Sequence, residues 1–423
     1  MSRGWRGVAF ALVGLTACGG EPAGGPEGAG PGSDPQSRAL AVLDATPVFD
    51  GHNDLPWEIR TAEAAPMDVA AYDLYGPVPG HTSIPLLQHG RVGAQFWSVY
   101  IPGEYADSGY ARMQLEQIDL ARLMIDRYPE LDLAGTAAEV EAAMSVGKIA
   151  SMLGVEGGHA IENSLGALRA YYDLGARYMT LTHNVTLDWA DAAQDEARHD
   201  GLTSFGEQVV REMNRLGMIA DLSHASPATM SDVLRVTAAP VIFSHSSARA
   251  LTDVPRNVPD SILARMSDNG GVVMVTYVPD FVSQDIADWE QRLVPVTDSM
   301  TAAGASESEL DAAREAYRRR TPRPLATLFD VADHIEHVRD VAGVDHVGIG
   351  SDYDGMGTPP VGLDDVSTYP NLFAELLSRG WTEEDLGKLA SGNILRAFRD
   401  VEAVSNRLRA DTKPAIAFPA PTR

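Results

Sequence analysis

The sequence predicts an α/β fold, a (β/α)8 barrel, and three observations support this prediction. The chain has 423 residues, which is ample for one eight-stranded barrel with insertions. Short apolar runs alternate about eight times with amphipathic stretches, as expected of parallel strands joined by helices. Six of the runs end in His, Asp or Glu, and barrel enzymes carry their catalytic side chains at that end of the strands.

The predicted strands are runs of β-branched and aromatic residues between turn-forming residues. They cover residues 48–54, 92–100, 149–156, 176–183, 218–224, 241–245, 271–277 and 346–352. The amphipathic stretches that predict helices are 113–128, 205–216, 227–236, 259–267 and 325–341. Pro227 and Pro259 stand where the first turn of a helix tolerates proline. Residues 281–324 are too many for a simple loop, so we expect a helical insertion, with a helix at 307–320, that forms part of a lid.

The N-terminal segment is patterned as an export signal rather than as part of the fold. Two arginines precede a short apolar stretch, and Leu15-Thr16-Ala17-Cys18 resembles the lipobox of bacterial lipoproteins, in which the cysteine carries the lipid. We therefore predict a signal peptide at 1–18, lipidation of Cys18, and an exported protein anchored to the membrane, facing the periplasm or the cell surface. An ordinary cleaved signal is the alternative. Cys18 is the only cysteine, so no intrachain disulfide can form.

Composition divides the rest of the chain and excludes one class of partner. Residues 19–37 are rich in Gly, Pro, Glu and Ser and predict a flexible tether, whereas residues 38–410 predict the barrel domain. Residues 411–423 predict a tail along the surface. The net charge of −26 at pH 7 argues against nucleic-acid binding, since phosphate contacts need a basic patch. We expect membrane contact through the lipid anchor only, because no other apolar run could span a bilayer.

The first predicted strand ends in His52 and Asp54, which suggest a metal site. Residues i and i+2 of an extended strand point to the same side, so an imidazole and a carboxylate converge. This pair suits a divalent metal of borderline softness, zinc above all. A surface turn built on Asn53 and Asp54 is the alternative for this stretch taken alone.

The other strand ends repeat this arrangement, which favours the metal site over chance. Their polar residues include Glu156, His183, His224, His245 and Asp352. His159, close to Glu156, is expected to act at most through a ligand. The remaining histidines lie in predicted loops, helices or the start of a strand, and we interpret them as solvated or structural: His81, His89, His199, His334, His337 and His346.

The side chains gathered at the strand ends would form a two-metal centre. Its ligands would be His52, Asp54, Glu156, His224 and His245. We assign the bridge to Glu156, because a carboxylate has two oxygens and its charge offsets the repulsion between two cations. Two zinc ions about 3.5 Å apart would lower the pKa of a shared water and polarise a carbonyl, which is chemistry for hydrolysing an amide, ester or phosphoester. A nucleophilic serine is disfavoured, because no Gly-x-Ser-x-Gly turn is present.

Eight stretches carry a resemblance to a known family. They are Asp50-Gly51-His52-Asn53-Asp54-Leu55-Pro56, Gly154-Val155-Glu156-Gly157-Gly158-His159, Leu181-Thr182-His183-Asn184, Trp189-Ala190-Asp191, Asp221-Leu222-Ser223-His224, Ser244-His245-Ser246-Ser247-Ala248-Arg249, Arg256-Asn257-Val258-Pro259-Asp260 and Gly348-Ile349-Gly350-Ser351-Asp352-Tyr353-Asp354-Gly355. In these stretches, which span residues 50–355 in the family's order, the chain resembles the membrane dipeptidase (renal dipeptidase) family of zinc peptidases. That resemblance implies an amidohydrolase-like TIM barrel and a metallo-dipeptidase.

The resemblance also implies a division of the ligands between two zinc ions. One ion would bind His52, Asp54 and Glu156, and the other would bind Glu156, His224 and His245. A water or hydroxide that bridges the ions would attack the peptide bond. The family resemblance further implies small dipeptide substrates as partners and a possible homodimer.

By the same resemblance, three further residues would hold the substrate. His183 would face the scissile carbonyl and stabilise the oxyanion. Arg256 would grip the free carboxylate in a bidentate manner that lysine cannot reproduce. Asp352 would pass a proton from the attacking water to the leaving amine and contact the substrate's amino group, with Asp354 as the competing candidate. Because both ends of the substrate are held, dipeptides would be favoured, including those with a D-residue on the carboxyl side.

Two other functions are compatible with parts of this pattern. One is a binuclear hydrolase of the same barrel type that acts on N-acyl amino acids, lactones or phosphoesters. Arg256 favours substrates with a free carboxylate over neutral lactones. The other is a solute-binding lipoprotein without catalysis, which the complete set of ligands and Asp352 disfavour.

Overall fold

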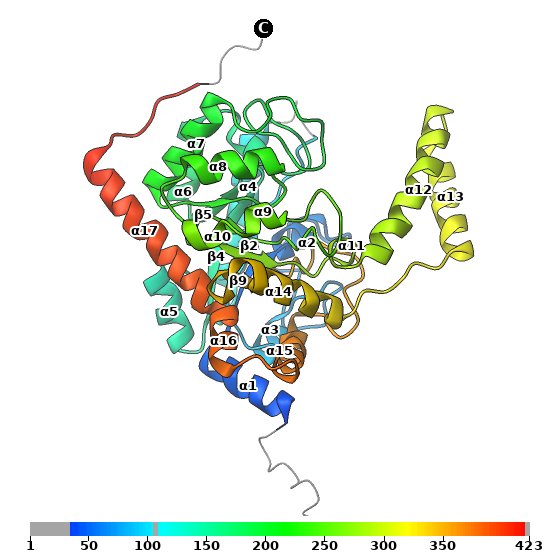
Figure 1. The fold of residues 1–423 in the computed structure, drawn as a ribbon, viewed down its shortest axis with the longest axis horizontal. Helices are drawn as coiled ribbons and strands as arrows, with labels where there is room; N and C mark the ends of the chain where they lie inside the picture. Colours follow the sequence, from blue (N-terminus) through cyan, green and yellow to red (C-terminus); the bar gives the residue numbers. More distant parts are fainter. Residues whose placement is uncertain (1–33, 105–108, 419–423) are drawn as a thin grey trace, which may run out of the picture.

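The computed structural model describes residues 34–104 and 109–418. Within them, parallel strands form one sheet that closes into a barrel surrounded by helices (Figure 1). The strands are β1 (Val48–Asn53), β2 (Val92–Ser98), β3 (Leu131–Leu133), β4 (Ile149–Glu156), β5 (Ala176–Thr180), β6 (Ile219–Asp221), β7 (Ile242–Phe243), β8 (Val272–Val275) and β9 (Val347–Ile349). Each of the eight predicted strands is present, so the predicted (β/α)8 barrel is confirmed.

Closure of the barrel depends on β4, which pairs with three neighbours. Its residues 150–154 pair with residues 94–98 of β2 and close the ring. The start of β4 also pairs with β3, and its end pairs with β5. β3 therefore lies outside the eight-stranded ring, and its three residues are too few to stand out as a strand in the sequence.

The helices connect the strands, and some of them begin at side chains that accept hydrogen bonds from their first turns. They are α1 (Pro35–Ala45), α2 (Leu55–Thr61), α3 (Ile84–His89), α4 (Tyr110–Arg127), α5 (Ala137–Ser145), α6 (Leu165–Asp173), α7 (Ser204–Leu216), α8 (Pro227–Val236), α9 (Asp260–Leu263), α10 (Met266–Asn269), α11 (Pro279–Val282), α12 (Gln284–Ala302), α13 (Glu307–Arg320), α14 (Leu328–Ala342), α15 (Tyr369–Ser378), α16 (Glu383–Gly387) and α17 (Asn393–Asp411). Thr203 and Ser226, for example, accept hydrogen bonds from backbone amides in the first turns of α7 and α8.

Two boundaries differ from those predicted. α1 begins at Pro35, so the last residues of the predicted tether form the first turn of a helix, where Asp34 Oδ1 accepts a hydrogen bond from Ser37 N at 3.0 Å. The predicted helix at 259–267 is two short helices, α9 and α10. The helix is interrupted at Arg265, whose Nη1 donates to Ser231 Oγ of α8 at 3.1 Å.

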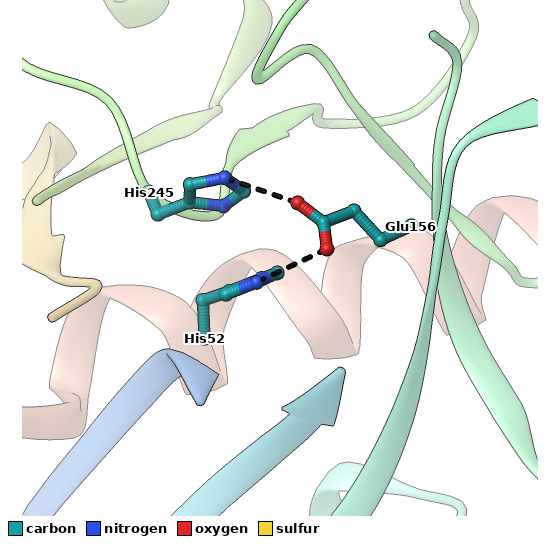
Figure 2. Close-up of side chains that lie close together, drawn as sticks. All are labelled: His52, Glu156 and His245. Atoms are coloured by element: carbon teal, nitrogen blue, oxygen red, sulfur yellow. Dashed lines mark ion pairs between the residues drawn. The ribbon is translucent and has the colours of Figure 1, made fainter. Parts of the chain in front are cut away.

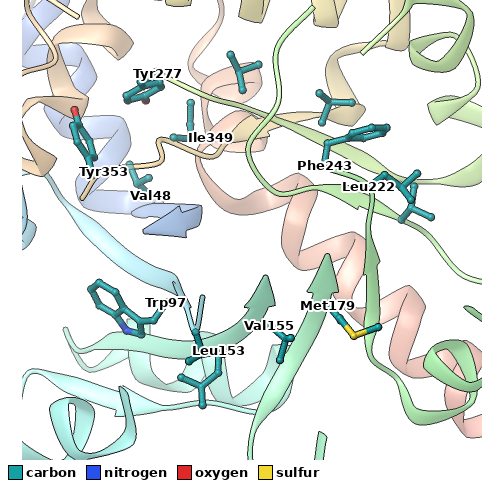
Figure 3. Close-up of a cluster of buried hydrophobic side chains, with 14 of the residues drawn as sticks. Val48, Trp97, Leu153, Val155, Met179, Leu222, Phe243, Tyr277, Ile349 and Tyr353 are labelled. Carbon is teal, nitrogen blue, oxygen red and sulfur yellow. The ribbon is translucent and has the colours of Figure 1, made fainter. Parts of the chain in front are cut away.

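The barrel strands are buried on both faces, which explains their nearly continuous apolar runs. Leu153 and Val155 of β4 belong to the layer that packs the strands against the helices (Figure 3). The side chains that alternate with them, such as Met152, belong to a second cluster, which also includes residues of α5 and α17. There Phe96 lies between Phe49 and Tyr178, and its ring centroid is 5.3 Å from that of Phe49 and 4.8 Å from that of Tyr178. This stack fills the barrel beneath the strand ends.

The insertion after β8 forms a hairpin of α12 and α13 that projects away from the barrel (Figure 1). The hairpin has a small core of its own, in which Trp289, Leu293 and Tyr317 are buried. The predicted helix at 307–320 is present as α13. Among the described residues of the insertion, Phe281 lines the cavity at the strand ends, and the lid expected here stays a prediction.

The two ends of the chain are described only in part. The predicted signal peptide, Cys18 and most of the predicted tether lie outside the described residues. Within the described ranges, no helix has the length and apolar character needed to cross a membrane. At the other end, Ala415 N donates to Glu212 Oε2 of α7 at 3.1 Å, so this part of the tail lies along the surface.

Candidate metal centre

The polar strand ends meet in one buried cluster at the carboxyl end of the barrel. Glu156, the last residue of β4, reaches both sides of the cluster (Figure 2). Its Oε2 atom is 3.5 Å from His52 Nε2, and its Oε1 atom is 3.2 Å from His224 Nε2 and 3.4 Å from His245 Nε2. Asp54 Oδ2 lies 3.2 Å from His52 Nε2. The structure therefore brings all five predicted metal ligands together.

Two of the histidines have their second ring nitrogen engaged by a fixed acceptor. His224 Nδ1 lies 3.1 Å from Asn184 Oδ1, an oxygen that can only accept. His245 Nδ1 lies 2.8 Å from Ser244 Oγ, whose own hydroxyl donates to Asp221 Oδ2 at 2.7 Å. Both Nδ1 atoms therefore carry the ring proton, and both Nε2 atoms present a lone pair.

These lone pairs face each other and a carboxylate, an arrangement that needs a cation. His224 Nε2 and His245 Nε2 are 2.9 Å apart, and both lie close to Glu156 Oε1. Three acceptor atoms in contact repel one another unless a positive ion lies among them. Two imidazole nitrogens and a carboxylate oxygen are common zinc ligands. The donor set thus fits the divalent metal that the strand ends predict.

Unpartnered atoms on the other side of the cluster lead to the same conclusion. His52 Nε2 and Asp54 Oδ1 are buried and have no hydrogen-bond partner among the described residues. Burial alone would lower the pKa of His52, but the Tyr178 oxygen and the carboxylates of Glu156 and Asp54 raise it well above its usual value. Burial raises the pKa of Asp352 and outweighs the effect of His52, and the nearby carboxylates raise it further. The site therefore concentrates negative charge and favours a bound cation.

The distances group the ligands differently from the predicted division between two ions, because His245 is grouped with His52. Three groups have candidate ligand atoms within 4.8 Å of one another: His52, Glu156 and His245; Glu156, His183 and His224; and His52, Asp54 and Asp352. His245 stands between the two sides, with its ring centroid 3.8 Å from that of His52 and 5.0 Å from that of His224. Glu156 is shared by two groups, in keeping with a bridging position.

His183 lies beside the ligands, three residues beyond the end of β5. Its Nε2 atom is 3.8 Å from Glu156 Oε1, and its ring centroid is 4.3 Å from that of His224 and 4.9 Å from that of Tyr100. Burial lowers the pKa of His183, so its ring is neutral at pH 7 and carries one N–H. That position and charge fit either a metal ligand or a donor to an oxyanion.

Arg256 is a buried cation in the cavity wall, 1% exposed. Its Nη1 donates to Ser246 Oγ and its Nη2 to His245 O, each at 3.2 Å. The guanidinium carbon lies 5.1 Å from the centroid of the Phe281 ring. Its Nε has no partner, and the described residues form no ion pair with it. Burial lowers the pKa of Arg256 to about 10, so the group is charged at pH 7 and suits an anionic ligand.

The two aspartates after β9 occupy different environments. Both line the cavity, but Asp352 has 12% of its side chain exposed, and its Oδ1 atom is 3.9 Å from His52 Nε2. The Asp354 side chain is fully buried. Its Oδ1 atom accepts from His81 N at 2.5 Å, and its backbone N donates to His81 Nδ1 at 3.0 Å. Asp354 thus fastens the His81 loop, which favours Asp352 as the group that meets a substrate.

Backbone strain is concentrated at this cluster. His224, Asp352 and Asp354 have φ values of 65°, 70° and 65°. A left-handed conformation costs a non-glycine residue about 1–3 kcal/mol and persists where the surrounding structure enforces it. All three residues line the cavity beside the cluster.

A cavity of about 400 Å³ opens beside the cluster, a volume typical of small-molecule sites. The predicted ligands among its lining residues are Asp54, Glu156, His224 and His245. Its aromatic walls, which the sequence analysis did not single out, are Trp57, Tyr100 and Phe281. Tyr100 is the last residue of one predicted strand and Trp57 follows another by three residues, and these positions could have identified them. The cavity suits a small substrate that carries both an amide and a carboxylate.

Three buried residues beneath the cluster support its ligands and were also missed. Asp50 accepts from His52 N at 3.0 Å, and Asp221 accepts from Ser244 N at 2.8 Å. Tyr178 Oη lies 2.8 Å from His52 Nδ1. A carboxylate within an apolar strand is unusual enough to have marked the two aspartates, whereas Tyr178 resembles an ordinary core residue.

The other histidines lie outside the groups of candidate ligands. His334 Nδ1, for example, accepts from Ala248 N at 3.0 Å. His159 Nε2 bonds Ile101 O at 2.9 Å, and burial lowers the pKa of His159 to about 4. Their bonds are those of structural residues.

Comparison with protein families gives a match over most of the chain. The family whose sequence profile matches residues 36–412 is described as membrane dipeptidase, peptidase family M19. Dipeptidase 3 of Rattus norvegicus is 42% identical over 394 residues, which cover 92% of this chain and 72% of that protein. Dipeptidase 3 of Homo sapiens is 42% identical over 392 residues, which cover 91% and 71%.

Solved structures show the same barrel. The probable dipeptidase PvdM from Pseudomonas aeruginosa aligns with a TM-score of 0.76 at 23% identity, covering 88% of this chain and 99% of that one, which shows a shared fold. A metallopeptidase from Rhodobacter sphaeroides, liganded with a phosphinate mimic of the dipeptide L-Ala-D-Ala, aligns with a TM-score of 0.69 at 25% identity, covering 84% and 99%.

Proposed function

Because the chain is a metallo-dipeptidase of the membrane dipeptidase family, peptidase family M19, we propose that it uses two zinc ions to hydrolyse dipeptides, including those with a D-residue at the carboxyl end. The contact of two bare imidazole nitrogens with the Glu156 carboxylate carries this proposal. Beside it lies Arg256, a buried cation that forms no ion pair among the described residues. A peptide with a free carboxylate satisfies both features, and the dipeptide mimic held by the Rhodobacter sphaeroides enzyme supports this substrate class.

We assign the ligands to the two ions as follows. His52, Asp54 and Glu156 would hold one ion, and Glu156, His224 and His245 would hold the other, because His224 and His245 both approach Glu156 Oε1 whereas His52 approaches Oε2. Bound there, two zinc ions would supply a water of lowered pKa and polarise the scissile carbonyl. The hydrogen bonds of His224 and His245 keep their ring protons on Nδ1, so that each Nε2 offers its lone pair.

The residues around the cluster hold the dipeptide at both ends. The carboxylate accepts from Arg256 through Nε, which is otherwise unpartnered, and through a neighbouring Nη in a bidentate pair. Asp352 takes a proton from the attacking water, passes it to the leaving amine and contacts the substrate's amino group. His183, neutral at pH 7, donates its N–H to the oxyanion.

The test is hydrolysis of a panel of L-Xaa-L-Xaa and L-Xaa-D-Xaa dipeptides by the full chain in detergent. The panel is run on the purified protein, on metal-stripped protein, and after zinc is restored. Asp352→Asn is compared with Asp298→Asn, an exposed aspartate of α12. We expect turnover that depends on zinc, is lost in Asp352→Asn and is kept in Asp298→Asn. A protein that binds two zinc ions yet hydrolyses none of the dipeptides would refute the proposal, and N-acyl amino acids would be tried next.

We also propose that the enzyme is exported and anchored to a membrane through a lipid on Cys18, with residues 19–33 as a tether to the barrel. The support is the lipobox-like Leu15-Thr16-Ala17-Cys18 and the absence of any other cysteine in the sequence. The check is cell fractionation of the wild type and Cys18→Ala. Recovery of both proteins in the same membrane fraction would contradict the anchor.

A further inference from the structure

One hydrogen bond inside the barrel draws attention to a residue beneath the metal cluster. His52 Nδ1 lies 2.8 Å from Tyr178 Oη, and both side chains are fully buried. The other ring nitrogen, His52 Nε2, is 3.2 Å from Asp54 Oδ2 and 3.5 Å from Glu156 Oε2. The imidazole therefore spans the distance between the phenol and the carboxylates.

The surroundings of Tyr178 fix its ring in this position. Phe96 packs against it with ring centroids 4.8 Å apart. Gly154 of β4 is paired directly with Tyr178 of β5, and a Cβ atom at Gly154 would collide with the tyrosine ring. Glycine at this place thus makes room for a large side chain, and the packing keeps Oη under His52.

Metal binding through His52 Nε2 requires the single ring proton to reside on Nδ1. Tyr178 Oη is placed to accept the hydrogen bond from that proton. We propose that Tyr178 is a positioning residue, which fixes the orientation and tautomer of His52 so that Nε2 faces Asp54 and Glu156. The inference rests on the metal sites of the proposed function and adds a residue that those sites do not include.

A neutral partner suits this side of the cluster. Asp54, Glu156 and Asp352 already bring three carboxylates close to His52. A tyrosine hydroxyl, unlike a carboxylate, is ordinarily neutral at pH 7, so Tyr178 offers an acceptor without a further negative charge. Positioning of a metal-bound imidazole by its second nitrogen commonly changes metal affinity about 10–100-fold.

The test compares Tyr178→Phe with Tyr171→Phe in the full chain. Tyr171 is a matched control, because it is 2% exposed and its Oη donates to Ala160 O at 2.8 Å, away from the cluster. Each variant loses one buried phenol hydroxyl and keeps the ring. Zinc affinity is measured by competition with a chelator, together with kcat, KM and the melting temperature.

We expect Tyr178→Phe to bind one of its two zinc ions about 10–100-fold more weakly than wild type. Its kcat should fall at limiting zinc and recover in excess zinc, with KM unchanged, whereas Tyr171→Phe keeps wild-type affinity. Equal zinc affinity in all three proteins, or an equal loss in both variants, would overturn the inference. Failure of the wild type to hydrolyse dipeptides would count against the proposed function alone, since the ratio of zinc affinities does not depend on turnover.

A second measurement requires no variant, in case Tyr178→Phe does not fold. A neutron crystal structure of the zinc-loaded wild type locates the deuteron between His52 and Tyr178. We expect it on His52 Nδ1, pointing at Tyr178 Oη. A deuteron on Oη that points at a bare Nδ1 would contradict the inference.

Discussion

The two sides of the metal cluster rest on two buried aspartates, whose hydrogen bonds follow one pattern but reach different groups. On the first side, Asp50 accepts from His52 N at 3.0 Å, from Ser351 N at 2.9 Å, from Ser351 Oγ and from Tyr369 Oη. These bonds, which we call the Asp50 network, join the end of β1 to the end of β9.

On the second side, Asp221 forms the corresponding bonds. It accepts from Ser223 N at 3.1 Å, from Ser244 N at 2.8 Å, from Ser244 Oγ at 2.7 Å and from Thr180 Oγ1 at 2.5 Å. These bonds, the Asp221 network, join β6 to the end of β7. In both networks the serine directly precedes a predicted site residue.

The networks differ in what they hold. The Asp50 network ends at the backbone of His52 and at Ser351, the residue before Asp352. The Asp221 network continues through Ser244 Oγ to the ring of His245. We infer that the first network places the residue that moves protons, whereas the second fixes the tautomer of a metal-binding imidazole.

The largest expected effect comes from the one carboxylate that both sides share. Glu156→Gln removes the negative charge and one of the two bridging oxygens. His224 and His245 then face an amide. We expect kcat/KM to fall at least about 10³-fold, because metal-assisted hydrolysis accounts for several kcal/mol of the barrier. Steady-state kinetics and zinc content check this, with the exposed Glu141→Gln as control. A loss below tenfold would show that the two sides function without the bridge.

The next test separates the two networks. Asp221→Asn should weaken zinc binding about 10–100-fold, because Ser244 loses the acceptor that orients it toward His245. Asp50→Asn should lower kcat more than zinc affinity, because it displaces Asp352. Chelator competition and steady-state kinetics are run on both variants.

Because both aspartates are buried, Ser244→Ala and Ser351→Ala provide gentler versions of the same comparison, with melting temperature as the check on folding. The aspartate variants form one pair and the serine variants the other. If the two variants of a pair showed the same ratio of lost zinc affinity to lost kcat, the proposed difference between the networks would be wrong.

A smaller effect is expected at Arg256, which bonds the backbone of the second side through His245 O. Arg256→Lys should raise KM for dipeptides, lowering kcat/KM roughly 30-fold, about 2 kcal/mol, because lysine cannot form the bidentate pair. A dipeptide amide lacks the carboxylate and should be hydrolysed poorly by both proteins. Equal penalties for the acid and the amide would remove the role assigned to Arg256.

The last prediction concerns stability, at a residue beyond the end of the Asp221 network, and not turnover or zinc binding. His334 is 1% exposed and accepts from Ala248 N, and burial lowers its pKa from 6.5 to about 4. The folded state therefore favours the neutral ring, so its contribution is present above pH 6.5 and is lost as the pH falls toward 4.

We expect a loss on the order of 1–3 kcal/mol across this window, measured by chemical denaturation at a series of pH values. His334→Asn keeps an acceptor for Ala248 N but does not titrate, so its stability should fall less steeply. Identical pH slopes for the two proteins would contradict this assignment.

The strand ends were predictable because their signal is local. An apolar run followed by His, Asp or Glu marks both a strand and the side chain at its tip, so His52, Glu156 and His245 could be placed before their distances were known. The same reasoning could not find Tyr178, which lies 126 residues from His52 in the sequence. Its contact exists only because the closed barrel brings the inward faces of β1 and β5 together.

The networks beneath the site were predictable in principle. Asp50 and Asp221 are charged residues within buried strands, and such residues need partners. Ser351, the partner of Asp50, follows β9 and lies 301 residues from it in the sequence, whereas Ser244, the partner of Asp221, follows the next strand along the chain, 23 residues away. The interruption between α9 and α10 was not predicted either; at that point Arg265 contacts Ser231 of α8, 34 residues away in the sequence.

The proposed hydrolysis depends most on the two-ion cluster around Glu156. The most direct measurement is anomalous diffraction at the zinc absorption edge from crystals grown with zinc. We predict two strong peaks, one on each side of the Glu156 carboxylate, with His52 and Asp54 at one and His224 and His245 at the other. A single peak, or two peaks that do not share Glu156, would contradict the account.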